Sequence, residues 1–128
     1  MNKENLLRMA DYSETIPQER FDVEIFREDN NHNTHECKSV GCTIGHCTIL
    51  DKYDNVPLFR GLINYVQWSY QFTGISKVSE WEYLFSADWK DVDNTPTGAA
   101  KRIRHFVENG LPDNWEEQIN GKATLGYV

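Results

Sequence analysis

Cysteine and histidine side chains are concentrated in one short stretch of this 128-residue chain. Three of the four histidines and all three cysteines fall between His32 and Cys47. Thiolate and imidazole are ligands that zinc prefers, and they also form the nucleophile and base of thiol enzymes. Metal binding and thiol catalysis are therefore two chemistries that this stretch could support.

The spacing of these residues fits a zinc site. Cys37 and Cys42 are separated by four residues, and Cys42 and His46 stand one helical turn apart. His32 or His35 would supply the fourth ligand. However, cysteine also packs in cores as a small hydrophobe, and the chain holds no second cysteine pair elsewhere. We expect packing and no cofactor. The alternative is a four-ligand zinc site made by Cys37, Cys42 and His46 with either His32 or His35.

Cys42 could also be a nucleophile, because a helix N-terminus lowers a thiol pKa and His46 could serve as its base. No third residue can be identified that would orient this base, so we predict no catalytic residue. The segment from Ser39 to His46 could instead present backbone N–H groups to a nucleotide phosphate, although the Gly-Lys-Ser/Thr ending of a P-loop is absent. Its candidate ligand-binding residues are Ser39, Gly41, Cys42, Gly45 and His46.

The hydrophobic periodicity of the chain predicts helices on either side of the cysteine and histidine stretch. A helix is expected over residues 3–14, with Leu6, Leu7 and Ala10 on one stripe. Alternating apolar residues over Arg20–Phe26 predict a short half-buried strand. A polar loop follows over 28–36, and a further helix is expected to begin at Ser39 and to run to Leu50.

The most apolar segment, Pro57 to Thr73, is predicted to be the central helix. Tyr65, Trp68 and Phe72 lie off its main stripe, so the helix is either buried all round or exposes an aromatic patch to a partner. We favour burial, because a wholly apolar helix is usually the centre of a compact domain. The main stripe consists of Phe59, Leu62, Ile63, Val66 and Tyr70.

Two later helices carry start signals. Ser79 and Glu82 form a capping box, which predicts a short helix beginning at Ser79. Thr95 is the predicted N-cap of the last long helix, with Pro96 in its first position and Gly110 at its end. Its predicted apolar stripe consists of Ala99, Ala100, Ile103, Phe106 and Val107. Trp115 is expected to anchor the segment that follows.

These elements predict a mainly α fold, with four to five helices and a minor β element in one compact domain covering residues 1–128. Asp88, Asp91 and Asp93 lack the spacing of a calcium loop, so we expect a solvated turn there.

Charge and composition exclude several classes of protein. Thirteen basic and twenty acidic residues give a net charge of −7, which disfavours general nucleic-acid binding. No segment approaches the roughly 20 apolar residues of a membrane span, and the N-terminal residues do not form a targeting signal. An odd number of cysteines fits reduced thiols in a cytoplasm.

Three blocks of the sequence carry a family resemblance. They are ENLLRMADYSETIPQERFDV (4–23), ECKSVGCTIGH (36–46) and EWEYLFSADWKDVDNTPTGAAKRIRHFVENGLPDNW (80–115). Together they resemble a family of small uncharacterised proteins of tailed bacteriophages and prophages. Members carry a Cys-Gly-Thr-like block ending in Cys-x-x-Gly-His or Cys-x-x-Gly-Trp, and a Thr-Pro-opened helix. This chain differs in Lys38-Ser39, where Gly-Thr is usual, and in its extra Cys47. The resemblance implies a phage accessory protein made in the host bacterial cytoplasm, and it assigns no activity.

Our first functional hypothesis is an accessory protein that binds and modulates a bacterial host component through protein contacts, without catalysis. The alternative is a protein that sequesters a small ligand or nucleotide at the Ser39–His46 helix start, and a metal- or thiol-dependent enzyme is third. An acidic surface on one face would favour the first hypothesis. A deep pocket beside Gly41 and Gly45 would favour the second.

Overall fold

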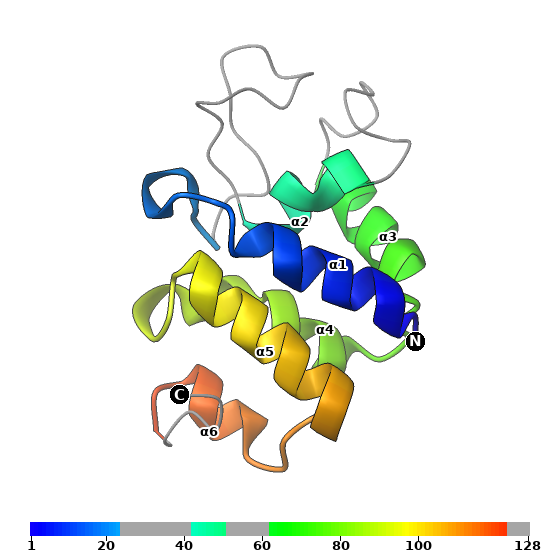
Figure 1. Ribbon diagram of the computed structural model, residues 1–128. Helices are drawn as coiled ribbons and strands as arrows, with labels where there is room; N and C mark the ends of the chain where they lie inside the picture. Colours follow the sequence, from blue (N-terminus) through cyan, green and yellow to red (C-terminus); the bar gives the residue numbers. More distant parts are fainter. Residues whose placement is uncertain (24–41, 51–61, 123–128) are drawn as a thin grey trace.

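The computed structural model describes residues 1–23, 42–50 and 62–122 of the chain. Within these ranges the chain forms one mainly α fold and no β-strand, which confirms the predicted fold class (Figure 1). The α-helices are α1 (Lys3–Ser13), α2 (Thr43–Cys47), α3 (Leu62–Thr73), α4 (Val78–Phe85), α5 (Pro96–Asn109) and α6 (Trp115–Ile119). Short 3₁₀ helices are η1 (Gln18–Arg20), η2 (Thr48–Leu50) and η4 (Ala87–Asp91). In the same ranges, no helix has both the length and the apolar character needed to cross a bilayer.

Helices α1 and α5 form the most extensive helix–helix contact among the described elements, and they run antiparallel side by side (Figure 1). Leu6 and Ala10 of α1 are fully buried, as is Ile103 of α5. Leu7 was predicted to share the buried stripe, but it is 40% exposed. Met9 is buried in its place, because helical periodicity puts residues 6, 9, 10 and 13 on one face and turns residue 7 away from it. Among the described residues, the fold is therefore centred on α1 and α5, and residues 57–61 of the predicted central helix lie outside the described ranges.

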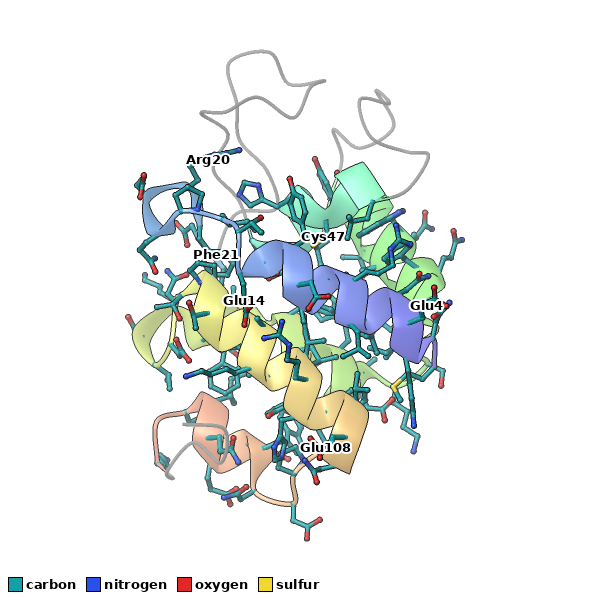
Figure 2. The ribbon with its side chains drawn as sticks, in the orientation of Figure 1. Glu4, Glu14, Arg20, Phe21, Cys47 and Glu108 are labelled. Atoms are coloured by element: carbon teal, nitrogen blue, oxygen red, sulfur yellow. The ribbon has the colours of Figure 1, made fainter. Side chains whose placement is uncertain are left out.

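Ion pairs connect the solvent side of α1 and α5. Arg104 of α5 donates hydrogen bonds to Asp11 of α1, at 2.8 Å, and to Glu14, the C-cap of α1. Figure 2 shows Glu14 at the C-terminal end of α1, where α5 passes beside it. The bond from Arg104 holds the pKa of Glu14 below its usual range. Acidic charge on this side of the molecule is thus matched by a cation.

Helix α5 begins as the sequence predicts. The Oγ1 atom of Thr95 accepts a hydrogen bond from the N–H of Gly98 at 2.9 Å, and Pro96 occupies the first turn. The same hydroxyl donates to Oδ1 of Asp93 at 2.6 Å. Gly110 ends the helix with φ at +79°, a conformation that favours glycine. The predicted stripe of α5 is buried except for Val107, which is half-buried.

The N-cap of helix α4 (Val78–Phe85) lies two residues earlier than predicted. This residue is Lys77, whose backbone carbonyl accepts from the N–H of Trp81 at 3.1 Å and closes the first turn. Ser79 lies inside that turn, so the capping box predicted for it is wrong. The indole N–H of Trp81 donates to Ser69 of α3 at 2.8 Å, which orients α4 on its neighbour.

Helix α3 buries the aromatic side chains that lie off its predicted stripe. Tyr65, Trp68 and Phe72 are buried, whereas Val66 and Tyr70 of the predicted stripe are only half-buried. Gln67 and Gln71 are exposed, so the helix is not buried all round. The predicted residues Phe59, Leu62 and Ile63 fall outside the side chains that the structure describes.

The strand predicted over Arg20–Phe26 is not shown in its described part, where Phe21 forms only an isolated β-bridge, and residues 24–26 lie outside the described ranges. Arg20 ends the 3₁₀ helix η1. Phe21 and Val23 are buried, and the backbone N–H of Val23 donates to the side-chain oxygen of Asn94 at 2.9 Å. The alternating pattern thus predicted the burial of Phe21 and Val23 correctly, and at Val23 the hydrogen-bond acceptor is a side chain, not the backbone of a neighbouring strand.

Candidate functional site

The structure describes three members of the cysteine and histidine stretch, namely Cys42, His46 and Cys47. Five further candidates lie outside the described residues: His32, His35, Cys37, Ser39 and Gly41. In the described part, helix α2 begins at Thr43, and Cys42 is its extended N-cap with φ −81° and ψ −179°. Cys42 therefore precedes the helix that carries His46, and its carbonyl oxygen accepts a hydrogen bond from the backbone N–H of His46 at 3.0 Å.

His46 is held inside the core by a backbone carbonyl. Its side chain is buried, and its Nε2 atom lies 2.7 Å from the carbonyl oxygen of Arg20. Because a carbonyl oxygen only accepts, Nε2 must carry the proton of this hydrogen bond. Neither proton abstraction nor metal binding can use Nε2 without breaking that bond. This arrangement agrees with the packing interpretation of His46.

Burial suppresses the reactivity of Cys42 and Cys47. Both are buried, and the Sγ atom of Cys47 donates to the carbonyl oxygen of Met9 at 3.7 Å. Loss of solvation raises the pKa of Cys42 from 9.0 to about 11, and burial also raises the pKa of Cys47. The prediction that a helix N-terminus lowers the pKa of Cys42 is wrong, since desolvation outweighs the local backbone hydrogen bonds. Both thiols are protonated at neutral pH, whereas a nucleophile needs thiolate.

We predict that Cys42 and Cys47 react slowly with 4,4′-dithiodipyridine at about pH 8 and at the free-thiol rate after unfolding in guanidinium. The folded pKa of Cys42, about 11, lies above its ordinary value of 9.0. Its contribution to stability is therefore complete below pH 9 and is lost as the pH rises through about 11. The measurement uses a Cys37→Ser background, so that only the two described thiols report. Native-state labelling as fast as labelling of the unfolded chain would contradict the prediction.

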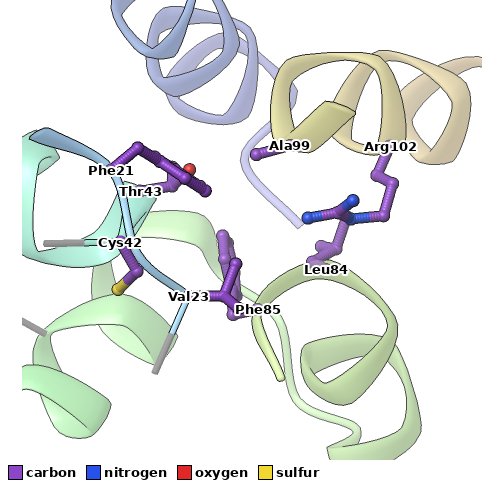
Figure 3. Close-up of a pocket in the computed structure, with 8 residues that line it drawn as sticks. All are labelled: Phe21, Val23, Cys42, Thr43, Leu84, Phe85, Ala99 and Arg102. Atoms are coloured by element: carbon purple, nitrogen blue, oxygen red, sulfur yellow. The ribbon is translucent and has the colours of Figure 1, made fainter. Parts of the chain in front are cut away.

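A hollow beside Cys42 is too small for an organic ligand. It leaves about 10 Å³, which is room for roughly one water molecule. Sites for drug-sized ligands occupy about 300–1,000 Å³. Figure 3 shows the lining residues Phe21, Val23, Cys42, Thr43, Leu84, Phe85, Ala99 and Arg102, with the guanidinium of Arg102 directed toward the hollow. Among the described residues, the predicted ligand-binding segment thus borders no deep pocket.

Arg102 is a buried cation that the sequence analysis missed. Its side chain is only 1% exposed, and its guanidinium carbon lies 4.3 Å from the centre of the Trp89 ring. One guanidinium nitrogen lies 3.7 Å from Oδ2 of Asp93. Asp93 is therefore not part of a solvated turn, as predicted, but a partner of Arg102 and of the N-cap Thr95. The signal was the position of Arg102 on the apolar stripe of α5, between Ala99 and Phe106.

No metal centre is assembled by the described residues alone. Residues 1–23, 42–50 and 62–122 contain no group of three or more His, Cys, Asp or Glu side chains that could hold a metal ion. The zinc hypothesis also needs residues 32, 35 and 37, which lie outside these ranges, so it stays a prediction. Cys42 and His46 are its described members.

Exposed carboxylates gather around α6 and η4. We call Asp88, Asp91, Asp113, Glu116 and Glu117 the acidic surface; all five residues are exposed. Within the part of the chain that the structure describes, none of their carboxylates forms an ion pair. Glu108 is also exposed and lies at the end of α5 that faces α6 (Figure 2). This surface contrasts with the α1–α5 side, where Arg104 pairs with the acidic residues.

Comparison of the sequence and the fold with known proteins identified no related protein. No protein-family model and no curated protein matches the sequence, and no solved structure matches the fold. The resemblance to small phage proteins therefore remains a prediction.

Proposed function

We propose that this protein is a phage accessory protein that binds a bacterial host component through protein contacts and modulates it without catalysing a reaction. The observation that carries this proposal is the acidic surface, whose five exposed carboxylates form no ion pair with the described residues. Charge that is not neutralised within the protein attracts a complementary surface and speeds association. The host component would therefore present a basic patch.

The local excess of charge supports a role beyond solubility. Residues 108–122 hold four acidic residues and one lysine, whereas solubility requires only a net charge spread over the whole surface. On α1, by contrast, Asp11 and Glu14 are bridged by Arg104. Among the described residues, the carboxylates of α6 and η4 are thus left without an ion pair, whereas those beside Arg104 are paired.

The described candidate residues give less support to the alternative functions. Cys42 and Cys47 are protonated and buried, and Nε2 of His46 is bound to a carbonyl oxygen. The hollow beside Cys42 admits roughly one water molecule, which is too little for a nucleotide. A protein-contact surface is the feature that remains exposed and chemically distinctive.

The test compares two variants of equal charge. The variant D113N/E116Q/E117Q removes three carboxylates of the acidic surface, and E4Q/E19Q/E82Q removes three exposed carboxylates elsewhere. Each tagged protein is expressed in bacterial cells, and the co-purifying proteins are quantified by mass spectrometry. We expect one host protein to be enriched by the wild type and the control, and about tenfold less by the acidic-surface variant.

Two results would overturn the proposal. The first is equal enrichment of that host protein by the acidic-surface variant, and the second is no enrichment above the untagged background. Circular dichroism of all three proteins ensures that lost binding is not lost folding.

A further inference from the structure

A surface hollow lies between η4 and the C-terminal end of α6, within the acidic surface. We propose that this hollow receives a lysine or arginine side chain from a basic segment of the protein partner. The inference rests on the proposed function and names the chemistry of the contact. The hollow measures about 450 Å³, which falls within the range of sites that take small ligands or peptide side chains.

The lining of the hollow suits both the apolar stem and the charged head of a lysine or arginine side chain. Asp88 and Asp91 supply exposed carboxylates, and half-buried Val92, with the small exposed part of Ile119, supplies apolar surface. Lysine and arginine lay an apolar stem along such surface and keep their charged head near polar groups. Lys90 also lines the hollow, so two carboxylates face one resident cation, and acidic character prevails.

The carboxylates are presented by an anchored element. Trp89, between the two aspartates, is fully buried, and its indole N–H donates to the carbonyl oxygen of Tyr83 at 2.8 Å. Its own carbonyl accepts from the N–H groups of Val92 and Asp93, at 3.0 and 2.8 Å. The N–H of Asp88 is bound by the Ser86 hydroxyl at 3.1 Å. A rigid backbone lowers the entropy lost on binding, as expected for a preformed contact site.

Charge decides which partner fits. A nucleic acid would place phosphates beside Asp88 and Asp91 and would be repelled. A basic peptide segment gains both the charge contact and the apolar contact, and its binding should weaken with salt. We therefore assign the hollow to a protein segment that carries lysine or arginine.

The inference is tested with a fluorescein-labelled peptide of sequence Gly-Lys-Arg-Gly-Lys-Arg-Gly, titrated with the full chain and followed by fluorescence anisotropy at about 50 mM salt. Two variants probe the hollow. D88N/D91N removes its carboxylates and should weaken binding about three- to tenfold, as expected for partly screened charges. A87W places a large side chain into the hollow from Ala87, an exposed residue of its lining, without changing the charge. This variant should bind the peptide at least about tenfold more weakly than the wild type.

Matched controls separate the hollow from general attraction. E4Q/E19Q removes two exposed carboxylates elsewhere, and Q71W adds a tryptophan on the exposed side of α3. Both should bind the peptide within about twofold of the wild type, and a peptide with glutamine at every basic position should not bind.

The outcomes distinguish this inference from the function on which it rests. Wild-type binding by A87W together with weak binding by D88N/D91N would place the peptide on the acidic surface outside the hollow and would overturn only the inference. Equal weakening by E4Q/E19Q, or no binding to the wild type, would also overturn it. Loss of peptide binding in A87W, combined with undiminished capture of the host protein by D113N/E116Q/E117Q, would instead support the hollow and contradict Asp113, Glu116 and Glu117 as the host contact.

Discussion

Replacing Gly98 by alanine is expected to lower the free energy of unfolding by about 2–4 kcal/mol, although alanine normally stabilises a helix by about 1 kcal/mol relative to glycine. A Cβ atom at Gly98 would lie 2.1 Å from Oδ2 and 2.3 Å from Cγ of Asp93. The carboxylate would have to leave its position. Asp93 would then lose both the Thr95 hydroxyl and its position beside Arg102.

The size of the loss follows from the burial of Arg102, which is 1% exposed. Breaking a buried ion pair costs roughly 3–5 kcal/mol, because a charge is left without its partner in a medium of low polarity. Subtracting the gain of about 1 kcal/mol in helix propensity gives the expected net effect.

A double-mutant cycle with Asp93→Ala isolates this cause. In the D93A background the obstacle is gone, so G98A should be neutral or stabilising by up to about 1 kcal/mol. Urea denaturation of the four proteins measures the cycle. Wild-type stability of the single G98A variant would show that Asp93 rotates away without cost and would contradict the prediction.

Replacing Leu6 by alanine is expected to cost about 2–5 kcal/mol, because Leu6 is fully buried at the centre of the fold, where α1 meets its neighbours. The loss combines the transfer of the missing methyl groups with the cavity that they leave. Leu7 provides a matched control on the same helix. It is 40% exposed, so Leu7→Ala should change stability by no more than about 0.5 kcal/mol.

Thermal denaturation of both leucine variants tests the orientation of α1. A large loss in L6A with none in L7A is the expected result. Similar losses in the two variants would show that α1 is rotated relative to α5 from the arrangement described here.

Helices α1 and α5 were predictable because their signals are local. The cap formed by Thr95, the proline that follows it, and the terminal Gly110 each act within a few residues of chain. The apolar stripe of α5 requires only the helical period. These features need no knowledge of what the helix packs against, and the structure confirms them.

Two predictions of local structure were not confirmed: the N-cap at Ser79 and the strand that begins at Arg20. In each segment a hydrogen bond reaches a residue that lies elsewhere in the sequence. Ser79 has the sequence of a capping box, yet the turn closes at Lys77, and Trp81 of the same turn reaches Ser69 of α3. Phe21 and Val23 alternate as in a strand, yet the acceptor for Val23 is the side chain of Asn94. In both cases the deciding contact lies far away in the sequence.

For the candidate site too, some properties follow from the sequence and others only from the tertiary structure. The sequence by itself determined the helical class, the excess of acidic residues and the clustering of cysteine and histidine, because composition and periodicity are properties of the chain alone. Only the tertiary structure decided that Cys42 and Cys47 stay protonated, that His46 binds the carbonyl of Arg20, and that Arg102 is buried against Trp89. The physical reason is that desolvation and pairing depend on which groups surround a side chain, and these neighbours come from segments far apart in the sequence.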